Sequence, residues 1–137
     1  MAVITPKSDD SAAQVRRWTQ HAAPAVVSLC AAWCDTCTEF RATLERIAQA
    51  RPDLLFVWLD IEDDSEICGD IDVENFPTLA IYRGESLLHY GVSLPVEGAV
   101  SRLIDQIVAR ADRVVAAPQA VLDLPRRLCA QLGDRAG

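Results

Sequence analysis

The chain has 137 residues, of which 50% are hydrophobic and 24% charged, a balance that suits one globular domain with a single core. Its formal net charge of −7 argues against nucleic acid as a partner, because phosphate backbones are bound by basic surfaces. The longest mainly apolar run, residues 22–34, is broken by Pro24 and Ser28 and is too short to span a bilayer. We therefore expect neither a nucleic acid nor a membrane partner.

The cysteine count and the first residues indicate a reducing compartment. Five cysteines are an odd number, which argues against a fully paired extracellular framework. Residues 1–6 lack the basic start and the long apolar stretch of a signal peptide. We therefore expect a cytoplasmic protein, in which a close cysteine pair is more often catalytic or metal-binding than structural.

The first elements are predicted to alternate between strand and helix. Residues 2–5 predict a short edge strand, and residues 8–11 offer an N-cap for a helix over about 11–21. The near-continuous apolar run 25–30 predicts a central strand that is covered on both faces.

The middle of the chain continues this alternation. Apolar residues at helical spacing predict a helix over 34–50, and the apolar run 54–60 predicts the next strand. A short acidic helix capped by a glycine is expected over 63–69. Strands at 78–83 and 86–90, joined by a turn that contains glycine, predict a hairpin.

The last part of the chain divides into a helix and a tail. An apolar stripe over 100–108 predicts a helix that begins after Pro95. The order β-α-β-α-β-α-β-β-α predicts an α/β fold with a mixed sheet flanked by helices. We expect one domain over residues 1–111 and a helical C-terminal extension over 112–137.

The extension contains the pattern of one short helix. Pro118 marks a joint, Pro125 fits the first turn of a helix, and Gly133 predicts its end. Three leucines at helical spacing line one face: Leu124, Leu128 and Leu132. This face either docks on the domain or is offered to a partner, and docking is the favoured alternative.

The most informative motif is Trp33-Cys34-Asp35-Thr36-Cys37, directly after the predicted central strand. If Cys34 opens the following helix, free backbone N–H groups and the positive helix end favour its thiolate, the form that attacks disulfides. Cys37 lies one turn further on the same face, close enough to form a disulfide with Cys34. This arrangement suits dithiol–disulfide exchange.

Over about residues 2–110 the chain resembles the thioredoxin family. A C-x-x-C pair beside a βαβ pattern is typical of that family, and Phe76-Pro77-Thr78 matches its loop with a cis proline facing the dithiol. Gly84 stands in the turn between the following strands, and Gly91 in a loop before the last helix. The resemblance implies a thioredoxin fold: a central mixed sheet flanked by helices, here with a C-terminal helical extension.

The resemblance also implies an enzyme, a thiol-disulfide oxidoreductase that acts as a protein-disulfide reductase. Cys34 would be the attacking nucleophile, and Cys37 would be the buried resolving thiol. The implied partners are protein disulfide substrates and a thioredoxin-reductase-like electron donor. No cofactor is implied, because the Cys34–Cys37 disulfide is itself the redox group. A zinc site is disfavoured, because no second Cys or His pair stands at ligand spacing; the oligomeric state is left open.

Substrate contacts are implied for residues around the dithiol. Trp33 would cover the two sulfurs and form part of an apolar contact surface. Phe76, before the cis Pro77, would offer backbone groups to an extended substrate segment, as in β-strand addition. Gly91 would keep the remaining wall of the groove low.

Four positions that tune the cysteine pKa values depart from the family. Ser28 stands where the family often has a buried acid, and Trp58 stands nearest to the lysine that often pairs with that acid. Asp35 and Thr36 replace the Gly-Pro between the cysteines, and a carboxylate at Asp35 facing the sulfurs would oppose thiolate formation. These departures can change the rate of disulfide exchange and the redox potential, but the reaction class implied by the resemblance stays the same.

Two further functions remain open. One is a thioredoxin-fold binding or assembly module with a slow or regulatory dithiol and the tail as its docking element. The other is an oxidase or isomerase, which fits the sulfur chemistry but not a reducing compartment.

The remaining cysteines and acids are given structural interpretations. Cys30 is expected to be a small core residue, Cys129 to pack in the tail, and Cys68 to be inert rather than regulatory or dimer-forming. Residues 60–74 hold many acids and no bases. A calcium loop is excluded there because Ser65 stands where the loop needs glycine, so we expect a solvated acidic face that selects electropositive partners.

Overall fold

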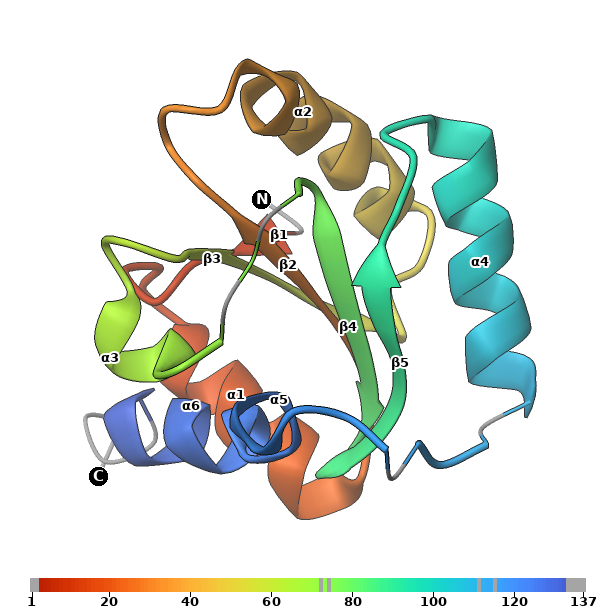
Figure 1. Ribbon diagram of the computed structural model, residues 1–137. Coiled ribbons are helices and arrows are strands. Elements are labelled where there is room, and N and C mark those ends of the chain that lie inside the picture. The colour runs from red at the N-terminus through yellow and green to blue at the C-terminus, as the bar shows by residue number, and fades with distance from the viewer. Residues whose placement is uncertain (1–2, 72, 74, 111, 115, 133–137) are drawn as a thin grey trace.

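The computed structural model describes residues 3–71, 73, 75–110, 112–114 and 116–132. Strands and helices follow the predicted order, with two further helices at the end (Figure 1). In chain order they are β1 (Val3–Ile4), α1 (Ser11–His21), β2 (Pro24–Cys30), α2 (Asp35–Gln49), β3 (Leu55–Asp60), α3 (Ser65–Cys68), β4 (Thr78–Arg83), β5 (Ser86–Val92), α4 (Glu97–Arg110), α5 (Gln119–Leu122) and α6 (Leu124–Leu132).

Strand β2 is the middle strand of a five-stranded sheet with the order β1-β3-β2-β4-β5. It runs parallel to β3 and antiparallel to β4, so the sheet is mixed. In this register Ser28 lies opposite Trp58 on one side and Leu79 on the other. The predicted central position of this strand is confirmed.

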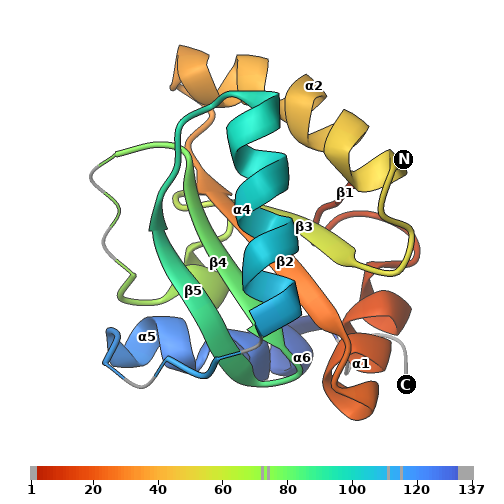
Figure 2. The ribbon, with the colours of Figure 1, turned by 90° about the vertical axis from the view of Figure 1, so that its right-hand side faces the viewer.

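Helices cover both faces of the sheet (Figures 1 and 2). Alternate residues of β2 enter two separate cores, because successive strand side chains point to opposite faces. Val26 belongs to a core that α2 and α4 complete. Val27 and Leu29 belong to a second core with residues from α1, α3, α5 and α6. Both faces of β2 are therefore buried, as its apolar sequence predicts.

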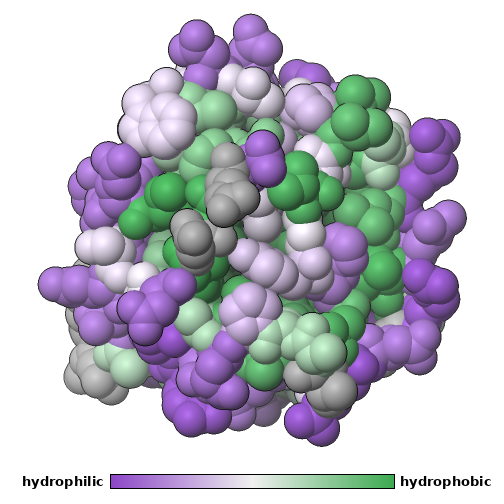
Figure 3. All heavy atoms as spheres, viewed as in Figure 1, coloured by the Kyte–Doolittle hydropathy of each residue, from purple (hydrophilic) through white to green (hydrophobic). Residues whose placement is uncertain are grey.

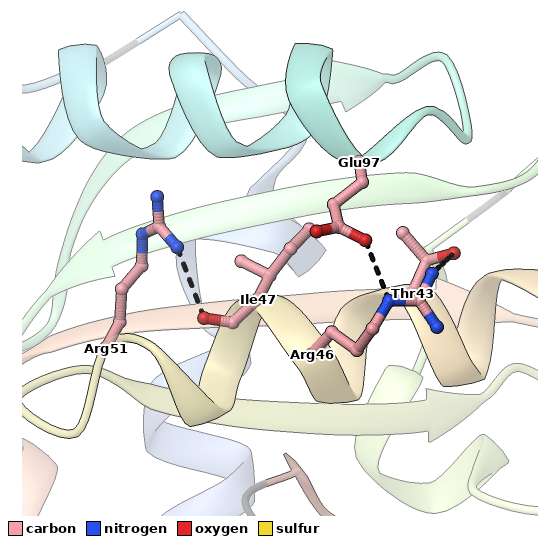
Figure 4. A network of polar contacts seen from close by, with 5 residues as sticks. All are labelled: Thr43, Arg46, Ile47, Arg51 and Glu97. Atoms are coloured by element: carbon pink, nitrogen blue, oxygen red, sulfur yellow. Dashed lines mark hydrogen bonds and ion pairs between the residues drawn. The ribbon is translucent and has the colours of Figure 1, made fainter.

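An ion pair joins α2 to the start of α4, and two further polar contacts lie along α2 and just after its end (Figure 4). Arg46 Nε donates to Glu97 Oε1 at 2.8 Å, and Arg46 Nη2 donates to Thr43 Oγ1 at 3.2 Å. Arg51 Nη1 donates to the carbonyl oxygen of Ile47 at 3.2 Å. The Arg46–Glu97 ion pair is exposed, so it contributes at most about 1 kcal/mol, and the apolar core between the helices determines their packing.

The acidic helix is shorter than predicted. The Asp60 carboxylate accepts hydrogen bonds from the backbone N–H groups of Glu62 and Asp63 at 2.8 and 3.0 Å. This local bonding holds the first acidic residues in turns, so α3 begins only at Ser65. The predicted cap is present, since Gly69 follows α3 with φ of 59°.

One other local prediction is wrong: Gly91 lies in β5, paired with Leu79, and not in the loop before α4. The predicted N-cap segment does contain the N-cap of α1, Asp10, although its side chain makes no hydrogen bond to the backbone of the first turn. Its carboxylate accepts from the Gln14 side chain instead.

The C-terminal extension docks on the domain. Leu124, Leu128 and Leu132 are all buried in the core that contains α1 and α3, which confirms the favoured alternative. The additional helix α5 has only four residues, too few for a periodic pattern to predict. The predicted stop at Gly133 lies outside the described residues, and the boundary between 111 and 112 stays a prediction.

Hydrogen bonds attach the extension to both α3 and the sheet. The Arg127 side chain donates to the carbonyl oxygens of Ile67 at 2.7 Å and Cys68 at 3.2 Å. Buried Tyr82 of β4 donates its hydroxyl to the Val121 carbonyl oxygen at 2.8 Å. Helix α6 therefore supports the short α3 and completes the core on that face of the sheet.

None of the helices formed by the described residues has the length and apolar character needed to cross a bilayer.

Replacing Leu128 tests whether the extension belongs to the folded core. Its side chain is fully buried, so Leu128→Ala should lower the free energy of unfolding by about 2–5 kcal/mol. Urea denaturation measures this change, with exposed Arg126→Ala as the control that should stay within about 0.5 kcal/mol. Equal stability of the two variants would contradict the packing described here.

Candidate active site

The dithiol lies where β2 gives way to α2. The strand ends at Cys30, and a tight turn follows in which the Cys34 N–H donates to the Ala31 carbonyl oxygen at 3.0 Å. Cys34 is the N-cap of α2, with φ of −91° and ψ of 116°, so the helix begins one residue after it. Its thiol is half-buried, whereas Cys37 is 1% exposed. The first thiol is therefore the accessible one.

The surroundings of Cys37 make its thiol harder to ionise. Burial raises the pKa of Cys37 above the ordinary thiol value, while the neighbouring Cys30 thiol and the Ala31 backbone oppose that rise. Burial also raises the pKa of Cys30. Cys30 and the Ala31 backbone thus lower the pKa of Cys37, whereas Cys34 raises it further.

The influence of Cys30 on Cys37 was not predicted from the sequence. Cys30 is buried, as expected of a core residue, and it also affects the pKa of Cys37. The position of Cys30 in the sequence could have indicated this, because Cys30 is the last residue of the strand that leads into the C-x-x-C turn.

An aromatic pair borders the dithiol turn. Trp33 is 64% exposed, and its indole Nε1 donates to Glu62 Oε1 at 2.8 Å. Its ring meets the Phe76 ring edge-on, with centroids 5.6 Å apart and planes at 83°. The Phe76–Pro77 peptide bond is cis, as the family resemblance implies. The predicted substrate residues Trp33, Phe76 and Pro77 are thus brought together.

Gly91 lies on the strand next to this loop. The Pro77 carbonyl oxygen accepts a hydrogen bond from the Ser93 N–H at 3.0 Å, which joins the loop to the end of β5. A Cβ atom at Gly91 would meet only His89 atoms, at 3.7 Å and beyond. The fold itself therefore does not require glycine at this position. The predicted role of Gly91, leaving room for a bound substrate segment, stays a prediction.

Exposed apolar side chains continue beyond Gly91 into the turn before α4. They are Val92, Leu94 and Val96. Figure 3 shows hydrophobic residues over this turn, in the same view as Figure 1.

The four residues predicted to tune the cysteine pKa values differ in burial and in their contacts. Ser28 is fully buried, and its Oγ lies 3.7 Å from the Cys30 sulfur. Trp58 is half-buried, with the Arg41 guanidinium carbon 5.0 Å from its ring centroid. Asp35 and Thr36 are exposed in the first turn of α2. Of these four side chains, Ser28 alone hydrogen-bonds with a cysteine, Cys30, and the influence of the other three on the thiols stays a prediction.

A cavity of about 430 Å³ adjoins Cys37, and its lining includes Lys7, Trp58, Asp60 and Asp64. The Asp64 Oδ2 accepts the Asp60 N–H at 2.8 Å. Burial raises the pKa of Asp64. Within the described residues, no three His, Cys, Asp or Glu side chains are placed to hold a metal ion.

The other two cysteines lie apart from the dithiol. Cys68 is buried at the end of α3, and burial raises its pKa to about 12, which fits the inert role that the sequence suggests. Cys129 is half-buried on α6, and its sulfur lies 3.8 Å from Thr19 Oγ1.

The central strand of a mixed sheet thus leads to two cysteines at the start of a helix, and the ring of Phe76, next to the cis proline, contacts the tryptophan that precedes them. A family model described as Thioredoxin matches residues 6–107. The chain therefore belongs to the thioredoxin family, which confirms the family and the fold predicted from the sequence.

Individual relatives match over part of their length. Putative thioredoxin 2 from Streptomyces coelicolor is 30% identical over 81 residues, 59% of this chain and 60% of that protein. Protein disulfide-isomerase MPD1 from Saccharomyces cerevisiae is 27% identical over 99 residues, 70% of this chain and 29% of that protein. The chain spans 61% of the length of a thioredoxin from Ophiophagus hannah.

Solved structures share the fold. A thioredoxin from Trypanosoma brucei brucei has a TM-score of 0.61 and 24% identity, covering 78% of this chain and 91% of that one. Oxidised thioredoxin O2 from Arabidopsis thaliana has a TM-score of 0.59 and 20% identity, covering 77% and 93%.

Removing the charge of Asp64 should stabilise the protein at neutral pH. Because burial raises its pKa, the ionised carboxylate is less favourable in the folded chain than in the unfolded chain. Asp64→Asn keeps an acceptor for the Asp60 N–H and removes that cost. Urea unfolding should show a higher free energy of unfolding near pH 7. The gain should shrink as the pH falls through the raised pKa and the wild type takes up its proton.

The exposed neighbour provides the control, since Asp63→Asn should change stability by no more than about 0.5 kcal/mol. A gain for Asp64→Asn that does not depend on pH would contradict the burial argument.

Proposed function

We propose that this protein is a protein-disulfide reductase that works by dithiol–disulfide exchange through Cys34 and Cys37. The observation that carries the proposal is the pairing of an accessible thiol at the α2 N-cap with a buried thiol one turn later. Free N–H groups of the first turn and the helix dipole favour an anion at Cys34. The buried partner is protected from outside disulfides but reaches Cys34.

The reaction has two exchange steps. The Cys34 thiolate attacks one sulfur of the substrate disulfide, the substrate S–S bond breaks, and the second substrate sulfur leaves with the bonding electrons. Cys37 then attacks the Cys34 sulfur of the mixed disulfide. The bond between Cys34 and the substrate sulfur breaks, the substrate departs as a thiol, and the enzyme is left with a Cys34–Cys37 disulfide. Two electrons have passed from the dithiol to the substrate.

The substrate is an extended protein segment with apolar side chains next to its disulfide. Trp33 and Phe76 provide an aromatic border on one side of the dithiol, and the exposed apolar turn after β5 extends the contact surface on another. Glu62 adjoins this border through Trp33, so a segment carrying basic residues fits better than an acidic one.

Electrons for the next cycle come from an external, thioredoxin-reductase-like donor, and the protein itself holds no cofactor beyond its redox-active cysteines. A dithiol that must be returned to the reduced state fits the cytoplasm, where thiols are kept reduced. This direction separates the proposal from the oxidase and isomerase alternatives.

A binding or assembly module with a slow dithiol is the second candidate. The raised pKa of Cys37 favours it, because a resolving thiol that resists ionisation leaves mixed disulfides long-lived. The docked extension does not favour it, since its apolar face is covered by the domain.

Single cysteine variants test the assignment of roles. In a reduction assay with insulin and dithiothreitol, Cys34→Ser should lose nearly all activity above the background of the reductant, because the attacking sulfur is gone. Cys37→Ser should accumulate a mixed disulfide through Cys34, detectable by mass spectrometry. Cys129→Ala serves as the control and should match the wild type. Activity that survives in Cys34→Ser would remove Cys34 from its role.

Catalytic cycling separates a reductase from a binding module. In an assay with NADPH, a thioredoxin reductase and insulin, NADPH should be consumed continuously when the wild-type protein is present. A binding module would instead allow NADPH consumption to stop after about one turnover. The reduction potential should lie below about −220 mV, nearer to thioredoxin than to protein disulfide isomerase. A potential near −120 mV would instead support an oxidase.

A further inference from the structure

The cavity beside Cys37 is separate from the surface predicted to contact protein substrates. Its volume of about 430 Å³ is in the range of small-molecule sites. Its lining includes none of the four predicted substrate residues, Trp33, Phe76, Pro77 and Gly91. The cavity therefore has room for a second kind of molecule next to the dithiol.

One wall of the cavity is basic and aromatic. Arg41 of α2 and Trp58 near the end of β3 form it, and the Arg41 guanidinium carbon lies 5.0 Å from the centre of the Trp58 ring. Both side chains are half-buried. Within the described residues, no carboxylate forms an ion pair with Arg41. Its N–H groups are thus available to a carboxylate, which a guanidinium can bind with paired hydrogen bonds.

The other wall is acidic and lies toward α3. Figure 1 shows α2 and α3 on either side of the end of β3. Asp60, Asp63 and Asp64 belong to this wall, together with Lys7, so its acids outnumber its single base. The Asp60 and Asp64 carboxylates already accept backbone N–H groups. The Asp63 carboxylate is exposed and has no hydrogen-bond partner among the described residues.

We propose that this cavity binds a small zwitterion of the amino-acid class, with its carboxylate at Arg41 and its ammonium group at the acidic wall. An anion alone would be repelled by the acids, and a cation alone would be repelled by Arg41 and Lys7, so a molecule that carries both charges is complementary to the lining. The apolar part of the ligand packs beside Trp58. No covalent bond changes, and binding does not depend on the proposed reductase function.

Three probes of one shape test the charge pattern. They are L-phenylalanine, hydrocinnamate, which lacks the ammonium group, and phenethylamine, which lacks the carboxylate. Binding near neutral pH is measured from chemical-shift changes of the N–H groups of Thr38, Trp58 and Asp64, which line the cavity. L-phenylalanine should bind about tenfold more tightly than either other probe, because each of them lacks one charged contact.

Variants of the two walls should separate the two charges. Arg41→Gln should weaken the binding of L-phenylalanine about tenfold without weakening that of phenethylamine. Asp63→Asn should weaken the binding of L-phenylalanine about three- to tenfold without weakening that of hydrocinnamate. The control is Arg102→Gln, which removes an exposed base of α4 outside the lining and should change none of the three affinities.

Two results would overturn the inference. One is the absence of shift changes at the cavity with millimolar L-phenylalanine, or changes that centre on Trp33 and Phe76 instead. The other is equal affinity for L-phenylalanine and hydrocinnamate, since the site would then recognise a carboxylate alone.

The binding measurement needs no turnover and so is independent of the reductase function. Cys34→Ser should lack reductase activity but bind L-phenylalanine as tightly as the wild type. If the wild type fails to reduce disulfides while the probes bind as expected, the reductase proposal falls and the zwitterion site stands.

Discussion

The hydrogen bonding of β2 along both of its edges fixes the point at which the strand ends. The strand cannot slip, because a shift of one residue would turn its core side chains to the wrong face. Cys30 therefore has a fixed position at the end of the sheet, and the turn through Ala31 places Cys34 at the start of α2. The accessibility of one thiol and the burial of the other follow from this junction.

The regular elements could be predicted because their apolar residues repeat with clear periods. The bounds of α1, β4 and the strand core of β2 agree closely with the sequence pattern. The same holds for the leucine face of α6, since a helical period of apolar residues requires a covering surface. The dithiol, Trp33 and the Phe76–Pro77 loop were recognisable because their residue types and spacing are uncommon in combination.

The features that could not be predicted from the sequence depend on interactions between residues far apart in the chain. The Arg127 bonds to the end of α3 join positions about sixty residues apart, and no local pattern indicates them. The link from Trp33 to Glu62 is similar, because either side chain alone is an ordinary surface residue. Cys30 was assigned to the core correctly, but its influence on the pKa of Cys37 depends on how α2 lies across the sheet, which periodicity does not determine.

The way α6 completes one core has a consequence for how this domain is handled. The family match ends at residue 107, yet the folding unit continues to Leu132, because the sheet face beneath α6 would otherwise meet water. Grafts, fusions and circular permutations guided by the family boundary alone would cut through the hydrophobic interior. The segment that matches the family (residues 6–107) is shorter than the segment that folds around the core, which extends to Leu132. Only the longer segment can be moved to another protein with its core intact.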